Sequence, residues 1–251
     1  MTIFSKIIAG QIPAYKIASN RWSIDEKDIP ENSNYIPQDS MFYDTDAFTN
    51  RALTWLDDYK KDDKPFFLYM AYTAPHWPLH AWPADIAKYK GVYDGGYEVV
   101  RQARYKRQVE IGLVDPKISP LPPMEIGETK PKWESLSAEE RKLEATRMEV
   151  YAAMVDRLDQ NIGRLLKRLE EQGKLKNTLV FFLSDNGACA VDPKVDKEDI
   201  KAPMGSVASY PSYGQNWATV SNTPLKKWKT TSYEGGISTP LIVNWPAVVK
   251  P

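Results

Sequence analysis

Asp185 and Asn186 place a carboxylate and an amide oxygen side by side, directly after an apolar segment at 178–184. One anionic and one neutral oxygen are ligands that a hard cation such as Ca²⁺ or Mg²⁺ prefers. Asp-Asn-Gly is also an ordinary turn sequence, and these residues alone favour a turn over a metal site. The pair is therefore a candidate cation site that needs further support.

His76 and Lys229 are the other side chains that could do chemistry. His76 follows the apolar segment at 65–72 and lies between two prolines, which restrict the loop. A structural and a catalytic histidine fit this position about equally well. Lys229 precedes a Gly-Gly pair that would let the backbone approach an anion closely, with a solvated lysine as the alternative. Three neighbouring side chains are expected to lie at the surface: His80, Lys226 and Lys227.

Apolar segments at 65–72, 178–184 and 240–244 are predicted to be β-strands of one mostly parallel sheet, buried on both faces. Ligands of open α/β sheets bind beyond the carboxyl ends of the strands, where the loops converge. Two of the predicted strands end in polar segments, those that carry His76 and Asp185. These side chains are therefore expected to converge with Asn186 and Lys229 on one cleft.

Apolar residues at helical spacing predict helices at 45–61, 97–113 and 138–172. Ser137 and Glu140 form a capping box at the start of the third. Strands together with helices indicate an α/β fold in which helices flank the sheet. Three arginines of the second helix are expected to form a solvated face rather than a basic binding patch: Arg101, Arg104 and Arg107.

The 251-residue chain has the length and the 42% hydrophobic content of one globular domain. Its 33 basic and 33 acidic side chains cancel, so neither nucleic acid nor a membrane surface is an expected partner. One cysteine, Cys189, and two histidines cannot assemble the usual zinc sites. No apolar run approaches the roughly 20 residues of a membrane span, and the N-terminus lacks a signal-peptide pattern. A cytoplasmic location is therefore expected for the chain as sequenced.

Three segments match one pattern when they are taken together. They are PFFLYMAYTAPHWPLHAWP, NTLVFFLSDNG and WATVSNTPLKKWKTTSYEGGISTPLIVNWP. In this order they resemble the sulfatases of the arylsulfatase type, over about residues 40–249. The resemblance implies an α/β fold of the alkaline-phosphatase-like superfamily. It also implies hydrolysis of sulfate esters with a bound calcium ion, for which Mg²⁺ is the alternative.

The resemblance gives four side chains a role. Asp185 and Asn186 match the calcium ligands of the family, and His76 matches its sulfate-contacting histidine. Lys229 matches the lysine that contacts the sulfate and the leaving oxygen. A cation, a lysine and a histidine around a sulfate ester would stabilise the charge that moves onto oxygen as the ester is cleaved. The implied partner is a small-molecule or glycan sulfate ester.

The family nucleophile has no counterpart in this sequence. It is a cysteine or serine in a C/S-x-P/A-x-R motif, is converted to formylglycine, and lies upstream with two aspartate ligands and a Lys/His pair. Cys189 lies in CAVDP, which does not fit that motif, and is expected to be inert. We therefore expect a partial sulfatase catalytic domain at 21–251, with an incomplete fold and no activity alone. One alternative is an inactive remnant that binds a cation or an anion. The other is a phosphoester hydrolase of the same superfamily; such enzymes usually hold their metals with several His and Asp residues, and the presence of only two histidines argues against it.

Residues 1–20 resemble the start of the histidine-triad nucleotide-binding proteins. The run of alternating histidines that performs catalysis in that family is missing, because His76 and His80 are the only histidines. We expect residues 1–20 to be a short foreign head that supplies no site.

Overall fold

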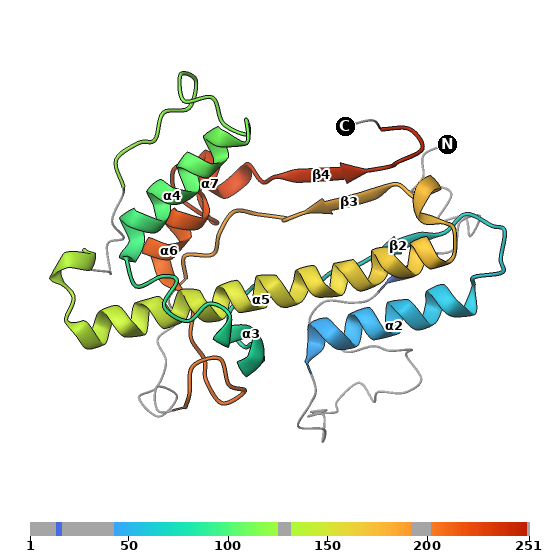
Figure 1. The fold of residues 1–251 in the computed structure, drawn as a ribbon, viewed down its shortest axis with the longest axis horizontal. Coiled ribbons are helices and arrows are strands. Elements are labelled where there is room, and N and C mark those ends of the chain that lie inside the picture. The colour runs from blue at the N-terminus through green and yellow to red at the C-terminus, as the bar shows by residue number, and fades with distance from the viewer. Residues whose placement is uncertain (1–13, 17–42, 125–131, 192–201, 250–251) are drawn as a thin grey trace. The chain divides into compact units, whose positions relative to one another are not determined.

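The computed structural model describes residues 14–16, 43–124, 132–191 and 202–249, so most of the predicted head at 1–20 lies outside the described residues. The chain divides into two compact units. The first unit comprises Met1–Ala74 and Leu158–Asn177, and the second comprises Pro75–Arg157 and Thr178–Pro251. Helix α5, Ala138–Glu171, is shared by the two units (Figure 1).

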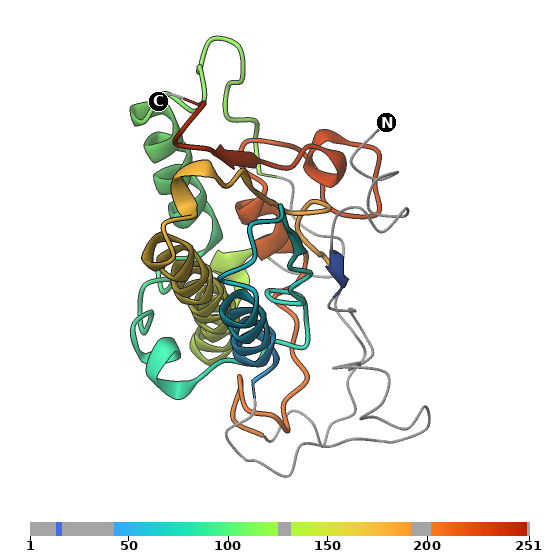
Figure 2. The same cartoon turned by 90° about the vertical axis from the view of Figure 1, so that its right-hand side faces the viewer.

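The first unit is built on two helices that lie side by side (Figures 1 and 2). Helix α2, Asp44–Asp58, begins after Tyr43 and has two acidic residues in its first turn, where they complement the helix dipole. Its apolar stripe packs against the C-terminal part of α5, and the shared core consists of Phe48, Ala52, Leu56, Leu165 and Leu169. The helix predicted at 45–61 is confirmed, with its end at Asp58.

The core of the second unit surrounds a tryptophan. Helices α3 (Pro83–Ala87), α4 (Gly96–Glu110), α6 (Gly214–Ser221) and α7 (Glu234–Ile237) belong to this unit. Trp217 on α6 is fully buried and meets the ring of Tyr97 on α4 edge to face, with centroids 4.7 Å apart. Both side chains bond to Glu144 on α5: Trp217 donates to its carbonyl at 2.9 Å and Tyr97 to its carboxylate at 3.0 Å.

Arg101 on α4 does not belong to a solvated face, so the prediction is wrong for this residue. Its side chain is buried, donates to the carbonyl of Pro122 at 2.5 Å, and pairs with Glu98 at 3.3 Å. A carbonyl and a carboxylate together compensate the guanidinium for lost hydration. Arg107, in contrast, is exposed as predicted.

Helix α5 begins and ends where the sequence predicts. Glu140 donates its backbone N–H to Ser137 Oγ at 3.2 Å, and Ser137 donates its own N–H to Glu140 Oε2 at 2.7 Å. These reciprocal bonds are the predicted capping box. The helix ends before Gly173, whose φ of 68° suits a glycine at a helix C-terminus.

The predicted strands do not share one sheet. Strand β1, Ala14–Lys16, pairs in parallel with β2, Phe67–Tyr69, in the first unit. In the second unit, β3, Val180–Leu183, pairs antiparallel with β4, Leu241–Asn244. The prediction of a single, mostly parallel sheet of three strands is therefore wrong for the described residues.

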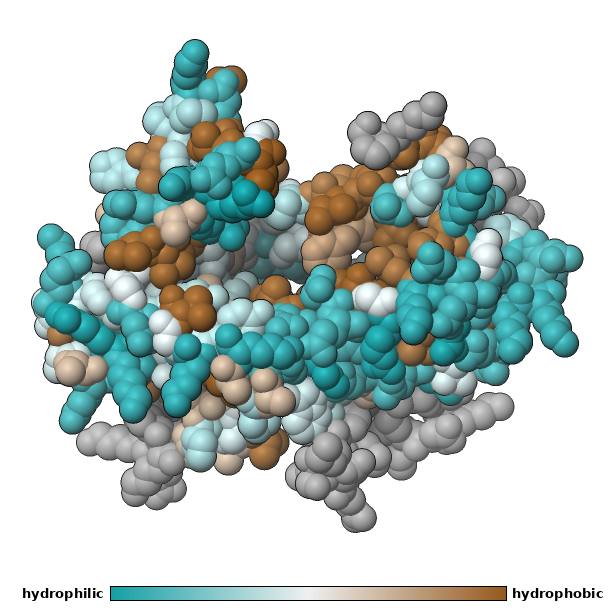
Figure 3. All heavy atoms as spheres, viewed as in Figure 1, coloured by the Kyte–Doolittle hydropathy of each residue, from teal (hydrophilic) through white to brown (hydrophobic). Residues whose placement is uncertain are grey.

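The strands of the second unit are also not buried. Phe181, Leu183, Leu241 and Ile242 are each between 55% and 59% exposed, and hydrophobic residues gather over β3 and β4 in Figure 3. A two-stranded ribbon can bury its side chains only against another layer, and the exposure of these four residues shows that no such layer of the described residues covers them. The apolar composition therefore predicts the two strands correctly, but the prediction that they are buried is wrong.

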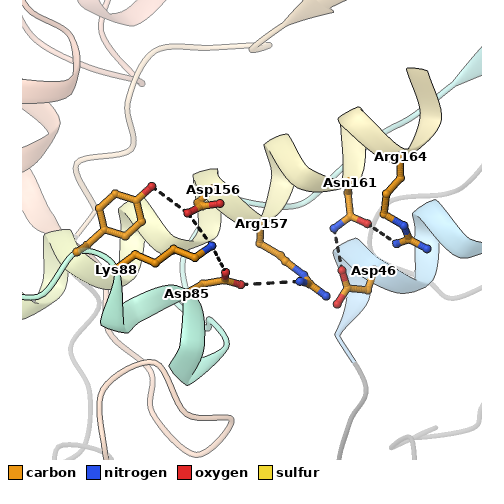
Figure 4. Close-up of polar contacts among 8 residues, drawn as sticks. Asp46, Asp85, Lys88, Asp156, Arg157, Asn161 and Arg164 are labelled. Atoms are coloured by element: carbon orange, nitrogen blue, oxygen red, sulfur yellow. Dashed lines mark hydrogen bonds and ion pairs between the residues drawn. The ribbon is translucent and has the colours of Figure 1, made fainter. Parts of the chain in front are cut away.

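Charged side chains hold α5 within each unit (Figure 4). In the second unit, Lys88 bridges Asp85 at 2.7 Å and Asp156 at 3.1 Å, and the hydroxyl of Tyr89 donates to Asp156 at 3.1 Å. These contacts join α3 and the residues after it to α5.

In the first unit, Asn161 on α5 donates to Asp46 on α2 at 2.7 Å. Two turns further along α5, Arg168 pairs with Asp57, and this hydrogen bond is the main cause that lowers the pKa of Asp57. Two polar links therefore flank the apolar contact between these helices.

Candidate functional site

Two loops of the second unit that carry predicted site residues are hydrogen-bonded to each other. We call residues 184–189 the Asp185 loop and residues 226–236 the Lys229 loop. The backbone N–H of Lys229 donates to the carbonyl of Ala188 at 3.0 Å, and that of Gly187 donates to the carbonyl of Gly236 at 3.1 Å. The structure therefore brings the segment with Asp185 and Asn186 directly beside the segment with Lys229.

Glycines allow the two loops to approach this closely. A Cβ atom on Gly187 would lie 1.7 Å from the carbonyl oxygen of Gly235, far inside van der Waals contact. A Cβ on Gly235 would lie 2.1 Å from the carbonyl of Lys227, and one on Gly236 would lie 2.2 Å from that of Thr231. The Gly-Gly pair that the sequence associates with approach to an anion thus serves the approach of backbone to backbone.

The Lys229 loop has an unusual backbone. Lys227 and Thr230 adopt φ values of 63° and 76°, in the left-handed region that disfavours side chains with a Cβ. Each such residue costs on the order of 1 kcal/mol and persists only where surrounding contacts maintain it. The hydroxyl of Thr231 donates to the carbonyl of Trp228 at 2.7 Å, and the Lys227 ammonium lies over the Trp228 ring, 5.4 Å from its centroid. Lys229 itself is half-buried.

Asn222 contacts both loops, and sequence reasoning missed it. Its Oδ1 accepts the backbone N–H of Ala188 at 3.1 Å, while its Nδ2 donates to the carbonyls of Lys227 at 2.8 Å and Gly235 at 2.7 Å. It is the residue that caps the C-terminus of α6. No helix is predicted in front of it, so the sequence gives no signal that singles out this asparagine.

Asp185 and Asn186 lie at the exposed side of their loop. Asp185 is exposed and Asn186 is half-buried. Two hydrogen bonds hold the N-terminal end of the loop: the Ser184 hydroxyl donates to the carbonyl of Asn186 at 2.8 Å, and the Thr239 hydroxyl donates to the carbonyl of Ser184 at 2.7 Å. The carboxylate and the amide are thus carried by a well-bonded turn.

Asp185 and Asn186 offer the type of oxygen ligand that Ca²⁺ prefers, but too few ligands to complete a site. Carboxylate and amide oxygens are suitable ligands, yet calcium takes about six to eight oxygens. The described part of the chain contains no group of three or more His, Cys, Asp or Glu side chains that could hold a metal ion. Asp185 and Asn186 can therefore supply only part of a calcium site.

His76 belongs to a different loop. Its Nδ1 lies 2.6 Å from the carbonyl of Trp77. A carbonyl only accepts, so this nitrogen carries the proton and Nε2 is left as an acceptor in the neutral ring. The exposed imidazole also meets the Trp77 ring, with centroids 5.5 Å apart. No hydrogen bond among the described residues joins His76 to the Asp185 or Lys229 loop, and convergence of the four predicted side chains stays a prediction.

His80 is half-buried rather than a free surface residue. Its Nε2 lies 2.7 Å from the carbonyl of Ser209, and its backbone forms an isolated parallel bridge with Gly205. This histidine therefore has a structural role in holding the segment at 205–211.

Two stacked tyrosines lie near Cys189 at the end of the Asp185 loop. The rings of Tyr151 and Tyr213 are 4.4 Å apart and 6° from parallel. Burial raises the pKa of both hydroxyls, that of Tyr213 strongly, so both stay neutral at physiological pH. Cys189 is a half-buried thiol without a disulfide.

Comparison with known proteins gives a consistent result. The Sulfatase family model matches residues 15–251. The chain is 38% identical to an uncharacterized sulfatase of Schizosaccharomyces pombe, over 84% of this chain and 39% of the relative. It is 36% identical to an arylsulfatase of Klebsiella aerogenes, over 86% of this chain and 47% of the relative. The chain thus spans less than half the length of these two relatives.

A solved structure of Ps i-CgsB in complex with k-i-k-neocarrahexaose aligns with a TM-score of 0.46 and 24% identity, over 81% of this chain and 28% of that chain. A TM-score this low does not establish a shared architecture. Among the helices that the structure describes, none is both long and apolar enough to cross a membrane.

Proposed function

Because the chain belongs to the sulfatase family, we propose that it carries part of the cation and sulfate site of a sulfate-ester hydrolase of the arylsulfatase type. The observation that supports this most is the bond between Lys229 N–H and the carbonyl of Ala188. It joins the loop of the proposed metal ligands to the loop of the proposed sulfate-binding lysine. The complete architecture proposed is that of the alkaline-phosphatase-like superfamily.

Lys229 is proposed to bind the anion. Its ammonium would neutralise charge on the sulfate oxygens and on the leaving oxygen as the ester bond breaks. His76 is proposed to contact the sulfate as the imidazolium, in which Nε2 also carries a proton to donate to a sulfate oxygen, because Nδ1 is held by the carbonyl of Trp77. The proposed substrate class is a sulfate ester of a small molecule or a glycan.

Asp185 and Asn186 are proposed as two ligands of a calcium ion, or of Mg²⁺. Such an ion supplies Lewis-acid stabilisation of charge on oxygen when it is bound. Two ligands leave most of its coordination to water or to groups outside the described residues.

The chain alone is proposed to bind without turnover. The motif that carries the formylglycine nucleophile in the family has no match in this sequence. Without this nucleophile, only water remains as an attacking group for the charge stabilisation to act on. A binding remnant is therefore the second candidate function, and the missing motif is the observation that favours it.

Two measurements on the full chain separate these functions. Calorimetric titration with sodium sulfate should show binding that Lys229→Ala weakens by about tenfold or more, since a charge-assisted contact is lost. Lys226→Ala, which changes an exposed lysine of the same loop, is the matched control and should bind as wild type does.

Release of 4-nitrophenol from its sulfate ester, with calcium present, should stay at the background rate. Turnover that Asp185→Ala abolishes would reveal a nucleophile in this chain, and absence of sulfate binding would contradict the proposed site.

A further inference from the structure

We propose that Asn222 is the positioning residue that presents the Asp185 loop and the Lys229 loop together. The inference rests on the proposed function, because it concerns the same two loops. Asn222 bears neither a charge nor a nucleophile, and its role lies in the three backbone groups that its amide connects.

The side-chain amide of Asn222 is used fully. Its oxygen holds the Ala188 N–H, and its two N–H groups hold the carbonyls of Lys227 and Gly235, all within 3.1 Å. An amide can do this because one side chain carries both an acceptor and two donors. Aspartate retains only the acceptor, and alanine retains neither function.

The contact with Lys227 falls where the Lys229 loop needs support. Lys227 has a φ of 63°, and the bond from Asn222 fixes the carbonyl of this same residue. Gly235, the second carbonyl bound by Asn222, is also the group that a Cβ on Gly187 would strike. One amide therefore stabilises the strained part of the Lys229 loop and its closest approach to the Asp185 loop.

Asn222 is attached to a rigid element. It directly follows α6, in which Trp217 and Ala218 have no exposed surface and Val220 has 1%. A side chain held by a buried helix fixes its partners more precisely than one on a loop. Asn222 thus fixes the position of the two loops relative to the core of the second unit.

The test compares Asn222→Ala and Asn222→Asp with wild type, and Asn244→Asp on the exposed strand β4 is the matched control. Amide hydrogen exchange and sulfate titration of the full chain are measured for each. Exchange of the amides in α4 and α6 reports whether each variant keeps its fold.

Two expected patterns distinguish positioning from general stability. In Asn222→Ala the Ala188 and Lys229 amides should exchange at least about tenfold faster, whereas the Asp variant should keep Ala188 protected because the acceptor remains. Both variants should bind sulfate about tenfold or more weakly, since both lose the bonds to Lys227 and Gly235. The α4 and α6 amides and the Asn244→Asp control should stay as in wild type.

The inference is overturned if both Asn222 variants bind sulfate within about twofold of wild type, or if exchange at Ala188 and Lys229 is unchanged in Asn222→Ala. A wild-type chain that binds no sulfate contradicts the proposed function instead. Asn222 is then judged by exchange alone, where faster exchange confined to the two loops supports its positioning role and unchanged exchange overturns it.

Discussion

The second unit contains two adjoining regions that are built in opposite ways. The Asp185 and Lys229 loops are tied by backbone bonds, by glycines without room for a Cβ, and by the amide of Asn222. The β3 and β4 strands, which lie next to these loops in the sequence, expose their apolar side chains. The geometry of the loops therefore depends on contacts made by the loops and α6, and not on burial of the strands.

Deleting a buried ring should produce the largest effect. Trp217→Ala removes a fully buried side chain and its bond to Glu144, so the free energy of unfolding should fall by about 3–5 kcal/mol. Phe181→Ala on the exposed ribbon should cost less than about 1 kcal/mol, because that ring is 56% exposed. Urea unfolding monitored by circular dichroism measures both. Similar losses for the two variants would contradict the contrast between these regions.

A single methyl group at the loop contact should come next. Gly187→Ala must displace the carbonyl of Gly235, so we expect a loss of about 2–3 kcal/mol together with weaker sulfate binding. Gly163 lies inside α5, where a Cβ meets nothing within 4 Å. Gly163→Ala should therefore stabilise the chain by about 0.5–1 kcal/mol. An equally harmless alanine at Gly187 would show that the loops do not pack as described.

The exposed ribbon should govern self-association rather than stability. Unpaired strand edges and an apolar surface favour contacts between chains. Phe181→Lys should reduce light scattering and binding of the dye ANS, while the free energy of unfolding changes by less than about 0.5 kcal/mol. Val99→Lys, at an exposed apolar position on α4, is the control and should leave scattering unchanged. Equal reductions by both variants would show that the ribbon has no special role.

A pH-dependent effect in the first unit should be the smallest. The pKa of Asp57 is lowered in the folded chain, chiefly by the hydrogen bond from Arg168, from its ordinary value of 3.8. A lowered pKa means that the folded state stabilises the ionised carboxylate of Asp57 relative to its protonated form. The interaction of Asp57 with Arg168 therefore contributes fully to the free energy of unfolding above pH 3.8. This contribution disappears as the pH falls through the folded-state pKa of Asp57.

Asp57→Asn should therefore lower Tm slightly at pH 7, and the difference from wild type should vanish in more acidic solution. A Tm difference that grows on acidification would contradict this sign. Asp58→Asn, at an exposed neighbouring position, is the control and should leave Tm nearly unchanged.

Local signals in the sequence predict the three long helices and three of the strands, but not the short helices α3, α6 and α7. The capping box of Ser137 and Glu140 and the glycine at 173 mark the ends of α5, because both signals act through nearby backbone groups. The apolar runs predicted strands correctly, but pairing and burial depend on partners distant in the chain. An apolar run such as 180–183 cannot by itself distinguish a buried strand from an exposed ribbon.

In the candidate site, too, the sequence identifies some residues, and others become recognisable only in the folded structure. Asp185 and Lys229 could be singled out by residue type and family resemblance, and their loops do meet. Asn222 could not, because its importance lies in bonds to three backbone groups that only the fold brings together. The sequence also does not predict that the close neighbours of the Gly-Gly pair are carbonyl groups of the same loop.

Chemical-shift titration of the ¹⁵N-labelled chain with sodium sulfate tests the proposed site most directly. At constant ionic strength, the amide signals of Ala188 and Lys229 should move together along one binding curve, while that of Gly112, just after α4, stays in place. In Lys229→Ala the movement at Ala188 should be lost at the same sulfate concentrations. Signals that stay unchanged in the wild type, or that move equally in Lys229→Ala, would contradict a sulfate site formed by the two loops.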